Sequence, residues 1–278
     1  MKKLEVAAKA KVNLSLDIVG KDGGFHELKT VVSTIDFGDK IIIKKRNDDR
    51  ISLKVVGSAG CSADENNAFK AGKLFKKTFR TSGFDILLKK KIPVGGGLGG
   101  SSADSAGALK GLKTLFGQKD DIATLSDALG SDTKYMLNGG FALLEGRGDK
   151  ITPIETDLKL YLILCIADGS VITKNAFKAY DEAGETFEES SDKMLAAVKK
   201  GDADGVIKNL KNDLFPSACT LLPEVKKNFE TMAKHYPTVM SGSGATVYSV
   251  FKTKKERDSA YKVLSRTLKG KLVKAETV

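Results

Sequence analysis

A glycine-rich stretch between two apolar segments constrains this chain more than any other feature of its sequence. Pro93–Asp104 follows a strand-like apolar run at Phe84–Leu88 and precedes a helix-like run at Ala106–Phe116. Glycine lets the backbone approach a ligand closely and adopt positive φ angles. A helix that begins directly after such a loop presents unpaired N–H groups and the positive end of its dipole. The pattern predicts a phosphate-binding loop, in which Ser101 and Ser102 cap the helix or contact a metal-bound phosphate.

Two common nucleotide-binding motifs do not describe this stretch. A P-loop needs Lys-Ser or Lys-Thr after its last glycine, whereas Gly100 is followed by two serines. The spacing of Gly95, Gly97 and Gly100 satisfies the dinucleotide fingerprint, but the acidic residues at the required distance begin a helix-like segment instead of ending a strand. A turn without a ligand is disfavoured, because so many glycines lose backbone entropy on folding. The stretch therefore indicates phosphate chemistry of another kind.

Composition sets broad limits on what the chain can be. It has 278 residues, 41% of them hydrophobic, which suffices for one large or two medium domains. The net charge is +11, but the lysines are spread in short runs and only mildly favour an anionic ligand. The cysteines Cys61, Cys165 and Cys219 are widely spaced, so neither a disulfide framework nor a metal cluster is expected. With no apolar run of membrane-spanning length and no signal-peptide core, a cytoplasmic location is expected.

Apolar periodicity predicts an α+β protein with two domains. In the first half, strands are predicted at Leu4–Ala8, Val12–Val19, Thr30–Phe37, Lys40–Lys45, Ile51–Val56, Phe84–Lys91 and 139–145, with helices at Asn66–Phe79, after Ser101, and over Asp121–Asn138 with a break at Gly130. In the second half, strands are predicted at Tyr161–Ala167, Thr238–Met240, Ala245–Phe251 and the C-terminal end, with helices at Thr173–Glu182, Ser190–Lys199, Ala203–Leu210, Pro223–His235 and Lys254–Leu268. A polar stretch containing Pro153 places the domain boundary between residues 152 and 153, so the domains are 1–152 and 153–278.

Two polar segments are candidates for the chemistry that phosphoryl transfer needs. Strand alternation puts Lys9, Lys11 and Asn13 on one face, where the ordinary interpretation is a solvated strand. Ser131 and Asp132 follow a glycine and begin a short helix, which they can simply cap. In a cleft, the same carboxylate can accept a hydroxyl proton beside a lysine that stabilises the developing alkoxide.

Two turns are candidates for ligand contacts. Gly23-Gly24-Phe25-His26 carries an aromatic ring that can stack on a base and an imidazole that can bond its edge, but a buried aromatic beside a loop histidine is an equal reading. Residues 241–245, Ser-Gly-Ser-Gly-Ala, form a second small-residue loop, either a plain hairpin turn or a second approach to the phosphates.

Several of these segments, taken in order, make the chain resemble the GHMP kinases over nearly its whole length. The matching motifs are 10–14, Ala-Lys-Val-Asn-Leu; 24–28, Gly-Phe-His-Glu-Leu; 37–39, Phe-Gly-Asp; 65–67, Glu-Asn-Asn; Pro93–Asp104; 130–132, Gly-Ser-Asp; 212–214, Asn-Asp-Leu; and 240–244, Met-Ser-Gly-Ser-Gly. The glycine-serine motif is specific to the superfamily. The Lys-x-Asn motif, together with the Gly-aromatic-His turn, is specific to the branch that phosphorylates a polyol linked to cytidine diphosphate.

The resemblance implies a fold and a set of site residues. It implies a ribosomal-protein-S5-like N-terminal domain, a ferredoxin-like C-terminal domain and an active site in the cleft between them. It assigns Asp132 as catalytic base and Lys11 as its partner. The implied ATP-binding residues are Gly95, Gly96, Gly97, Leu98, Gly99, Gly100, Ser101, Ser102 and Asn67, and the implied substrate-binding residues are Asn13, Phe25, His26 and Phe177. ATP is the implied co-substrate and Mg²⁺ the expected metal, although no carboxylate cluster indicates its ligands. The expected partner is a small cytidyl-diphosphate substrate acted on by a monomer or homodimer, with no nucleic acid and no membrane.

The sequence departs from the family pattern at four places. Lys134 stands where proline is usual, Phe25 replaces tyrosine, Gly23 replaces an acidic residue, and residues 167–169, Ala-Asp-Gly, replace a Pro-Gly turn. These changes bear on substrate affinity more than on reaction type. Two alternatives remain open: another small-molecule kinase of the superfamily, acting on mevalonate, homoserine or a sugar, and a non-catalytic protein that binds nucleotides or RNA.

Overall fold

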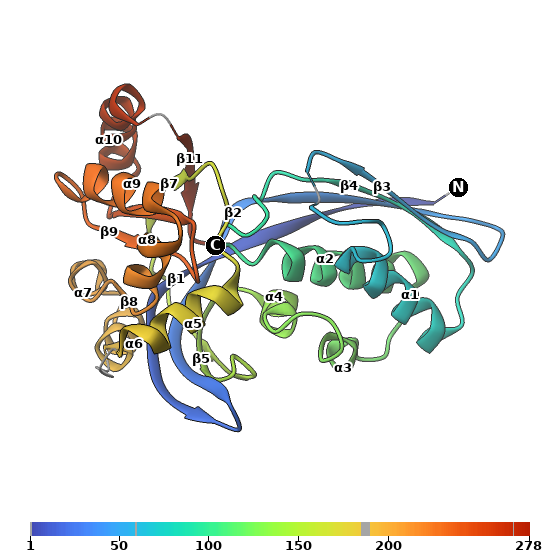
Figure 1. Cartoon of the computed structure of the whole chain (residues 1–278). Helices are drawn as coiled ribbons and strands as arrows, with labels where there is room; N and C mark the ends of the chain where they lie inside the picture. Colours follow the sequence, from blue (N-terminus) through green and yellow to red (C-terminus); the bar gives the residue numbers. More distant parts are fainter. Residues whose placement is uncertain (1, 59, 185–189, 269) are drawn as a thin grey trace. The chain divides into compact units, whose positions relative to one another are not determined.

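The structure of the protein is a computed structural model that describes residues 2–58, 60–184, 190–268 and 270–278 (Figure 1). The chain falls into two compact units, each assembled from several segments. The first unit comprises Met1–Ala10, Gly38–Val94 and Gly99–Gly139, and the second comprises Lys11–Phe37, Gly95–Leu98 and Gly140–Val278. The long strands β1 (Lys3–Asp22) and β2 (Phe25–Lys45) contribute residues to both units. The domain boundary expected between residues 152 and 153 stays a prediction.

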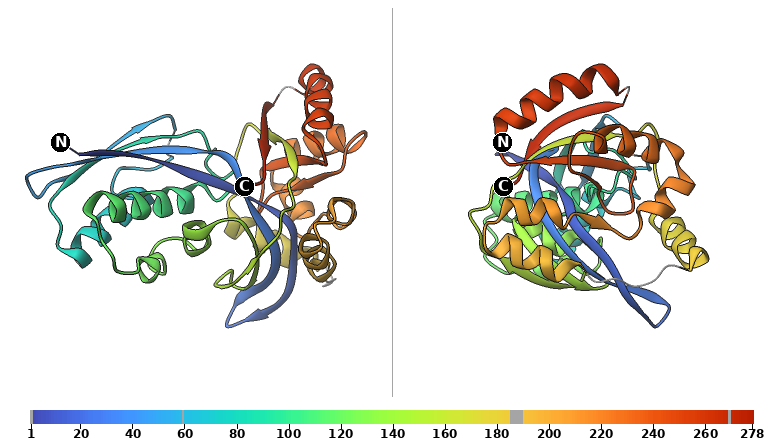
Figure 2. Two further views of the ribbon diagram at one scale, coloured as in Figure 1. Left: turned by 180° about the vertical axis from the view of Figure 1, so that it is seen from behind. Right: turned by 90° about the vertical axis from the view of Figure 1, so that its left-hand side faces the viewer.

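The first unit is a sheet with helices packed on one face (Figures 1 and 2). The strand order there is β3–β4–β2–β1, with β4 antiparallel to β2 and parallel to β3. The remaining elements of this unit are β3 (Ile51–Val56), β4 (Phe84–Lys89), α1 (Asn67–Phe79), α2 (Gly100–Phe116), α3 (Ala123–Ser126) and α4 (Thr133–Asn138). Helix α1 packs along α2, and the α2 N-terminus follows directly from the glycine-rich stretch.

Two glycines allow α2 to pack directly on side chains of strand β2. A Cβ atom on Gly107 would stand 2.8 Å from Cδ1 of Ile41, and one on Gly111 would stand 2.7 Å from Cδ1 of Ile43. Both isoleucines are fully buried beneath the helix. Because a larger residue at either glycine would push the helix outward, these contacts fix the level of α2 over the sheet and the position of its first turn.

The second unit contains two sheet regions and the remaining helices. One region has the strand order β6–β5–β2–β1–β8, and the other is an antiparallel sheet with the order β11–β7–β10–β9. The strands are β5 (Phe141–Gly146), β6 (Lys150–Ile154), β7 (Tyr161–Ile166), β8 (Lys211–Asn212), β9 (Thr238–Met240), β10 (Thr246–Phe251) and β11 (Lys271–Glu276). The helices are α5 (Thr173–Ala183), α6 (Ser191–Lys199), α7 (Ala203–Lys208), α8 (Phe215–Leu221), α9 (Pro223–Ala233) and α10 (Lys254–Thr267). None of the helices in the described part of the chain has the length and apolar character needed to cross a membrane.

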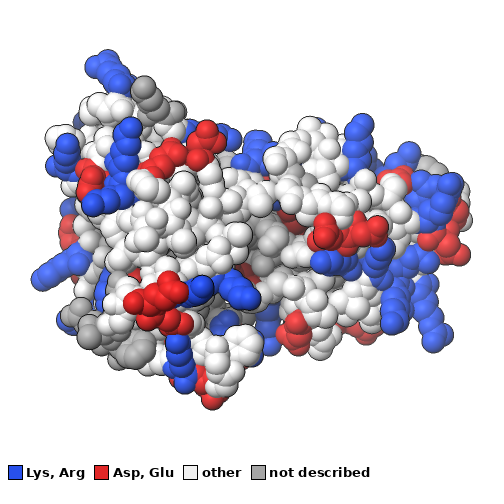
Figure 3. Space-filling view, viewed as in Figure 1, with Lys and Arg blue, Asp and Glu red and all other residues white. Residues whose placement is uncertain are grey.

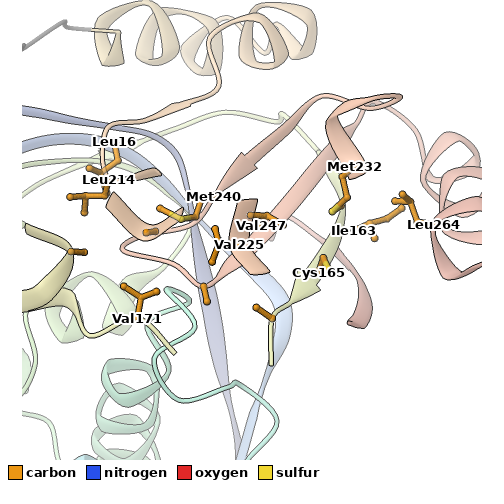
Figure 4. Packing of buried hydrophobic residues seen from close by; sticks show 14 of the residues in the cluster. Leu16, Ile163, Cys165, Val171, Leu214, Val225, Met232, Met240, Val247 and Leu264 are labelled. Atoms are coloured by element: carbon orange, nitrogen blue, oxygen red, sulfur yellow. The ribbon is translucent and has the colours of Figure 1, made fainter. Parts of the chain in front are cut away.

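The core of the second unit lies between its antiparallel sheet and the helices that cover it (Figure 4). Ile163 and Cys165 of β7 pack with Met232 of α9 and Leu264 of α10, all essentially without exposed surface. Burial raises the pKa of the Cys165 thiol to about 12, so this cysteine acts as an apolar core residue.

The expected α+β class is confirmed, and most elements lie within a few residues of their predicted positions. Three expectations need correction. The four strands expected before residue 46 are two continuous strands, β1 and β2, which are neighbours in the sheet. No strand was predicted in the polar stretch around Pro153, but this stretch contains strand β6, which tolerates proline because, among the described residues, it pairs only with β5. Helix α8 was not predicted, although Pro216 stands in its first turn, where proline is favourable.

Candidate active site

Every backbone carbonyl from Gly95 to Leu98 accepts a hydrogen bond within the second unit. The oxygen of Gly95 accepts from the N–H groups of residues 171 and 245, and that of Gly96 accepts from residue 246. Ser241 Oγ donates to the oxygen of Gly97 at 2.9 Å, and the Lys11 N–H donates to that of Leu98 at 3.1 Å. The loop is therefore held entirely through its carbonyl side.

The amide side of the same stretch has no protein partner. In the described part of the chain, the N–H groups of residues 95–102 donate no hydrogen bond to the protein. Those of residues 99–102 belong to the first unit and lead into α2, whose N-cap, Gly99, has a φ of 68°. Consecutive N–H groups at a helix N-terminus form an anion site. The geometry supports the predicted phosphate-binding loop.

Gly97 is the position of this loop where a side chain has no room. Its φ is +73°, and a Cβ atom there would stand 2.0 Å from the carbonyl oxygen of Ser241 and 2.9 Å from that of Gly244. Residues 241–245 form the turn between β9 and β10, and they also touch the glycine loop within the second unit. The turn is thus a hairpin connection and, at the same time, a support for the loop.

Lys11 and Asn13 are buried, so the interpretation of this segment as an ordinary solvated strand face is wrong for both. They are 6% and 3% exposed, whereas Lys9 is exposed as expected. Lys11 Nζ donates to Asn13 Oδ1 at 2.6 Å, and the N–H of Gly242 donates to the same oxygen at 3.0 Å. Asn13 Nδ2 donates to Thr30 Oγ1 at 2.9 Å. Asn13 therefore links the lysine, the neighbouring strand and the β9–β10 turn.

Asn212 is a structural part of the site to which sequence reasoning gave no role. Its amide nitrogen donates to the carbonyl oxygens of Met240 and Gly242 at 2.8 and 2.9 Å, and its carbonyl accepts the N–H of Leu214. It lies in β8, which pairs with β1 two to three residues beyond Asn13. The motif at residues 212–214 could have drawn attention to Asn212. The contact of Asn212 with the β9–β10 turn depends on tertiary structure, which the motif does not show.

Asp132 occupies the N-cap position of α4 in the first unit, but its carboxylate does not cap the helix. The local turn is closed instead by Thr133, whose hydroxyl accepts the Gly130 N–H at 3.0 Å. A Cβ atom on Gly130 would stand 2.6 Å from Ser102 Oγ, so this turn packs directly on the first turn of α2. The capping interpretation is therefore wrong for Asp132, which follows the turn that packs on the first turn of α2.

A buried cluster of charged side chains holds helix α2, the helix that follows the glycine loop. Lys90 Nζ bonds Asp39 at 2.5 Å and Asp104 at 2.7 Å, and all three side chains are at most 7% exposed. Burial raises the pKa of the Asp104 carboxyl, the Lys90 ammonium group lowers it, and the Asp39 carboxylate raises it. The net result is a pKa of about 7. Asp39 also accepts the N–H groups of residues 91 and 92. The cluster ties β4, α2 and the entry to the glycine loop together.

His26 and Phe177 lie together in the second unit. Their rings stack with centroids 4.6 Å apart and planes inclined by 21°. Phe25, by contrast, is 52% exposed, and the guanidinium of Arg147 lies 3.5 Å from its ring centroid. The histidine is therefore ordered by α5, while the phenylalanine beside it presents an aromatic surface to solvent.

The remaining predicted site residues have simpler surroundings. Asn67 is the first residue of α1, directly after Asn66, whose side chain caps that helix, and its place in the ATP site stays a prediction. Lys134 is exposed. No group of three or more His, Cys, Asp or Glu residues that could hold a metal occurs among the described residues.

Comparison with known proteins identifies the class to which this fold and loop belong. The model of the GHMP kinases N terminal domain matches residues 66–143, and the model of the GHMP kinases C terminal domain matches residues 194–270. The chain belongs to the GHMP kinases, which use ATP as co-substrate.

Two relatives and one solved structure are named for the same kinase. The 4-diphosphocytidyl-2-C-methyl-D-erythritol kinase of Caldicellulosiruptor saccharolyticus is 33% identical over 89% of this chain and 88% of the relative. The kinase of the same name from Shouchella clausii is 33% identical over 96% of this chain and 91% of the relative. A crystal structure of 4-(cytidine 5'-diphospho)-2C-methyl-D-erythritol kinase superposes with a TM-score of 0.83 at 26% identity, covering 98% of both chains.

Proposed function

We propose that this protein transfers the γ-phosphoryl group of ATP to the C2 hydroxyl of 4-diphosphocytidyl-2-C-methyl-D-erythritol, a step of the non-mevalonate isoprenoid pathway. The observation that carries the proposal is the run of N–H groups at residues 95–102, which have no acceptor among the described residues, at the start of α2. Such N–H groups are suited to the negative charge of a nucleotide's phosphates.

The reaction requires one proton transfer and one phosphorus–oxygen exchange. Asp132 accepts the proton of the substrate hydroxyl, and the oxygen forms a bond to the γ-phosphorus as the bond to the β-phosphate oxygen breaks. The Lys11 ammonium stabilises negative charge on the attacking oxygen and the transferring group, while the loop N–H groups bind the charge that remains on ADP. Lys11 and Asp132 belong to different units, and each role is proposed from the surroundings of the residue in its own unit.

The residues fit a Mg²⁺ ion that arrives with the nucleotide rather than a metal bound by the protein alone. Mg²⁺ commonly keeps several waters and takes one or two protein ligands beside substrate phosphates. The exposed hydroxyl of Ser101, in the first turn of α2, would hold it together with phosphate oxygens. When bound, the ion supplies positive charge that neutralises the phosphates.

The substrate's base is proposed to bind at the turn after β1. Phe25 offers an exposed ring face for stacking. His26, the next residue in the sequence, forms an ordered aromatic pair with Phe177 of α5. A second face of Phe25 is covered by Arg147, whose charge suits a diphosphate. The protein is further proposed to act in the cytoplasm as a monomer or homodimer.

The experiment measures ADP release from ATP and Mg²⁺ with four acceptors in parallel: the cytidyl-linked polyol, mevalonate, homoserine and galactose. Turnover with the cytidyl compound alone is expected. Turnover with another acceptor instead would overturn the substrate assignment. On the face seen in Figure 3, Lys and Arg lie at separate places with Asp and Glu between them, which does not favour a nucleic-acid surface. Silence with every acceptor, together with salt-sensitive RNA binding, would overturn the proposal as a whole.

The assignment of the base has its own matched test. Asp132→Asn keeps the size of the side chain and removes its basicity, so kcat is expected to fall by about 10²-fold or more while ATP still binds. Asp127→Asn, an exposed aspartate just after α3, is the control and should leave kcat unchanged. Equal activity of the two variants would sink the assignment of Asp132.

A further inference from the structure

One face of helix α5 holds the His26 imidazole by three contacts. Phe177, Tyr180 and Asp181 are spaced at i, i+3 and i+4, which places them side by side on the helix surface. The imidazole stacks on Phe177, meets the Tyr180 ring edge-on with centroids 6.2 Å apart, and places Nε2 2.8 Å from Asp181 Oδ1. The His26 side chain is only 11% exposed. Packing fixes the plane of the ring, and the Asp181 carboxylate fixes which edge faces the helix.

The charge on Asp181 decides which ring nitrogen carries the proton. The pKa of its carboxyl is lowered by the hydrogen bond from Lys21, whose Nζ lies 2.6 Å from Oδ1, and further by His26. An ionised carboxylate only accepts hydrogen bonds, so Nε2 of His26 must be the donor. In the neutral imidazole the other nitrogen, Nδ1, is then an acceptor. Among the described residues, nothing bonds to His26 Nδ1.

We propose that Asp181 is a positioning residue that holds neutral His26 in the Nε2–H form, so that Nδ1 accepts from the exocyclic amino group of a cytosine and selects it over uracil. The inference rests on the proposed function, because it takes the nucleotide-linked substrate as the ligand of this turn. The amino group of cytosine is a donor, whereas the corresponding group of uracil is a carbonyl acceptor. An Nδ1 atom without a proton therefore accepts a hydrogen bond from the cytosine amino group and repels the uracil carbonyl oxygen. Lys21, paired with the same oxygen, keeps the Asp181 carboxylate ionised.

The position of the proton can be measured in the protein without any ligand. Nitrogen-detected NMR of the imidazole distinguishes the two tautomers, and the chain has only two histidines, so a His26→Gln variant assigns the signals. The wild type is expected to show the Nε2–H form of neutral His26. Asp181→Ala is expected to show a mixture of tautomers. Glu182→Gln, which removes a charge from the next position of the same exposed helix, is the control and should keep the wild-type spectrum. A spectrum unchanged in Asp181→Ala would overturn the positioning role.

The selectivity is measured with the cytidyl-linked substrate and its uridyl counterpart. Asp181→Ala is expected to raise KM for the cytidyl compound about 10-fold, to leave KM for the uridyl compound nearly unchanged, and to keep kcat within about twofold. An equal rise of both KM values would mean that Asp181 acts only on the structure of the turn. If the wild type turns over neither compound, the proposed function and the selectivity fail together, while the tautomer measurement still decides whether Asp181 positions His26.

Discussion

The ammonium group of Lys11 donates a 2.6 Å hydrogen bond to the side-chain oxygen of Asn13, two residues further along strand β1. Residues i and i+2 share a face of a strand, so this pairing is a direct result of sequence spacing. The same oxygen accepts the N–H of Gly242, and one amide hydrogen of Asn13 bonds Thr30. Most of the hydrogen-bonding capacity of Asn13 is thus used inside the protein. Its contact with substrate stays a prediction, and its structural role is to hold Lys11.

Asn13→Ala is expected to lower kcat by about 10²-fold, because Lys11 loses the acceptor that orients its ammonium group. KM for ATP should change less, since the carbonyls of the glycine loop keep their own donors, including the Lys11 backbone N–H. Steady-state kinetics on the purified variant separate the two parameters.

A double-mutant cycle tests whether Asn13 acts through Lys11. Lys11→Met is expected to abolish nearly all turnover, and adding Asn13→Ala should then cost little more. If the fold losses of turnover in the two single variants multiply in the double variant, Asn13 does not act through Lys11. That result would contradict the positioning role and favour direct contact of Asn13 with the substrate. Thermal denaturation of all three variants shows whether the fold has survived.

Asp104→Asn is expected to flatten the dependence of stability on pH. The pKa of Asp104 is raised by burial from 3.8 to about 7. Because the folded state binds this proton more tightly than the unfolded state, the stabilisation is complete below about pH 4 and is lost as pH rises to about 7. The loss is on the order of 4 kcal/mol. Urea denaturation between pH 5 and pH 8 should show a falling free energy of unfolding for the wild type and a shallower fall for the variant, and parallel curves would refute the assignment.

Lys90→Met is expected to destabilise the first unit by about 3–5 kcal/mol, because it leaves the buried carboxylate of Asp39 without its ammonium partner. Lys91→Met, at the adjacent exposed position, is the control and should cost little. The free energy of unfolding is measured by urea titration at pH 7. Similar losses in both variants would show that the buried cluster contributes no more than a surface charge.

The sequence allowed the elements and the loop to be predicted because both depend on local pattern. Helix α1, for example, was expected at Asn66–Phe79 and is Asn67–Phe79, since apolar spacing and a capping asparagine define it. The glycine loop was predicted for the same reason, because glycine and helix-start signals stand next to each other. These are properties that neighbouring residues determine among themselves.

The burial of polar groups could not be predicted in this way. Alternation placed Lys11 and Asn13 on one strand face but did not show that the β9–β10 turn covers that face. Asn212 supports the turn by donating to the carbonyl oxygen of Met240, which lies 28 residues further along the chain. The contact between Lys90 and Asp39 joins residues that are 51 positions apart. Such contacts depend on how distant segments come together, which periodicity along the chain does not encode.

Gly97→Ala is expected to raise KM for ATP by about 10-fold or more, because a Cβ atom there would stand 2.0 Å from the carbonyl oxygen of Ser241 and force the loop to move. Gly117→Ala separates this clash from the cost of a positive φ. Gly117 has a φ of 68°, close to the 73° of Gly97, but nothing lies within 4 Å of the position of its Cβ. The control variant should therefore lose only about 1 kcal/mol of stability and keep its KM for ATP. If both variants bound ATP equally well, the close approach of the loop to the β9–β10 turn would have no part in shaping the phosphate site.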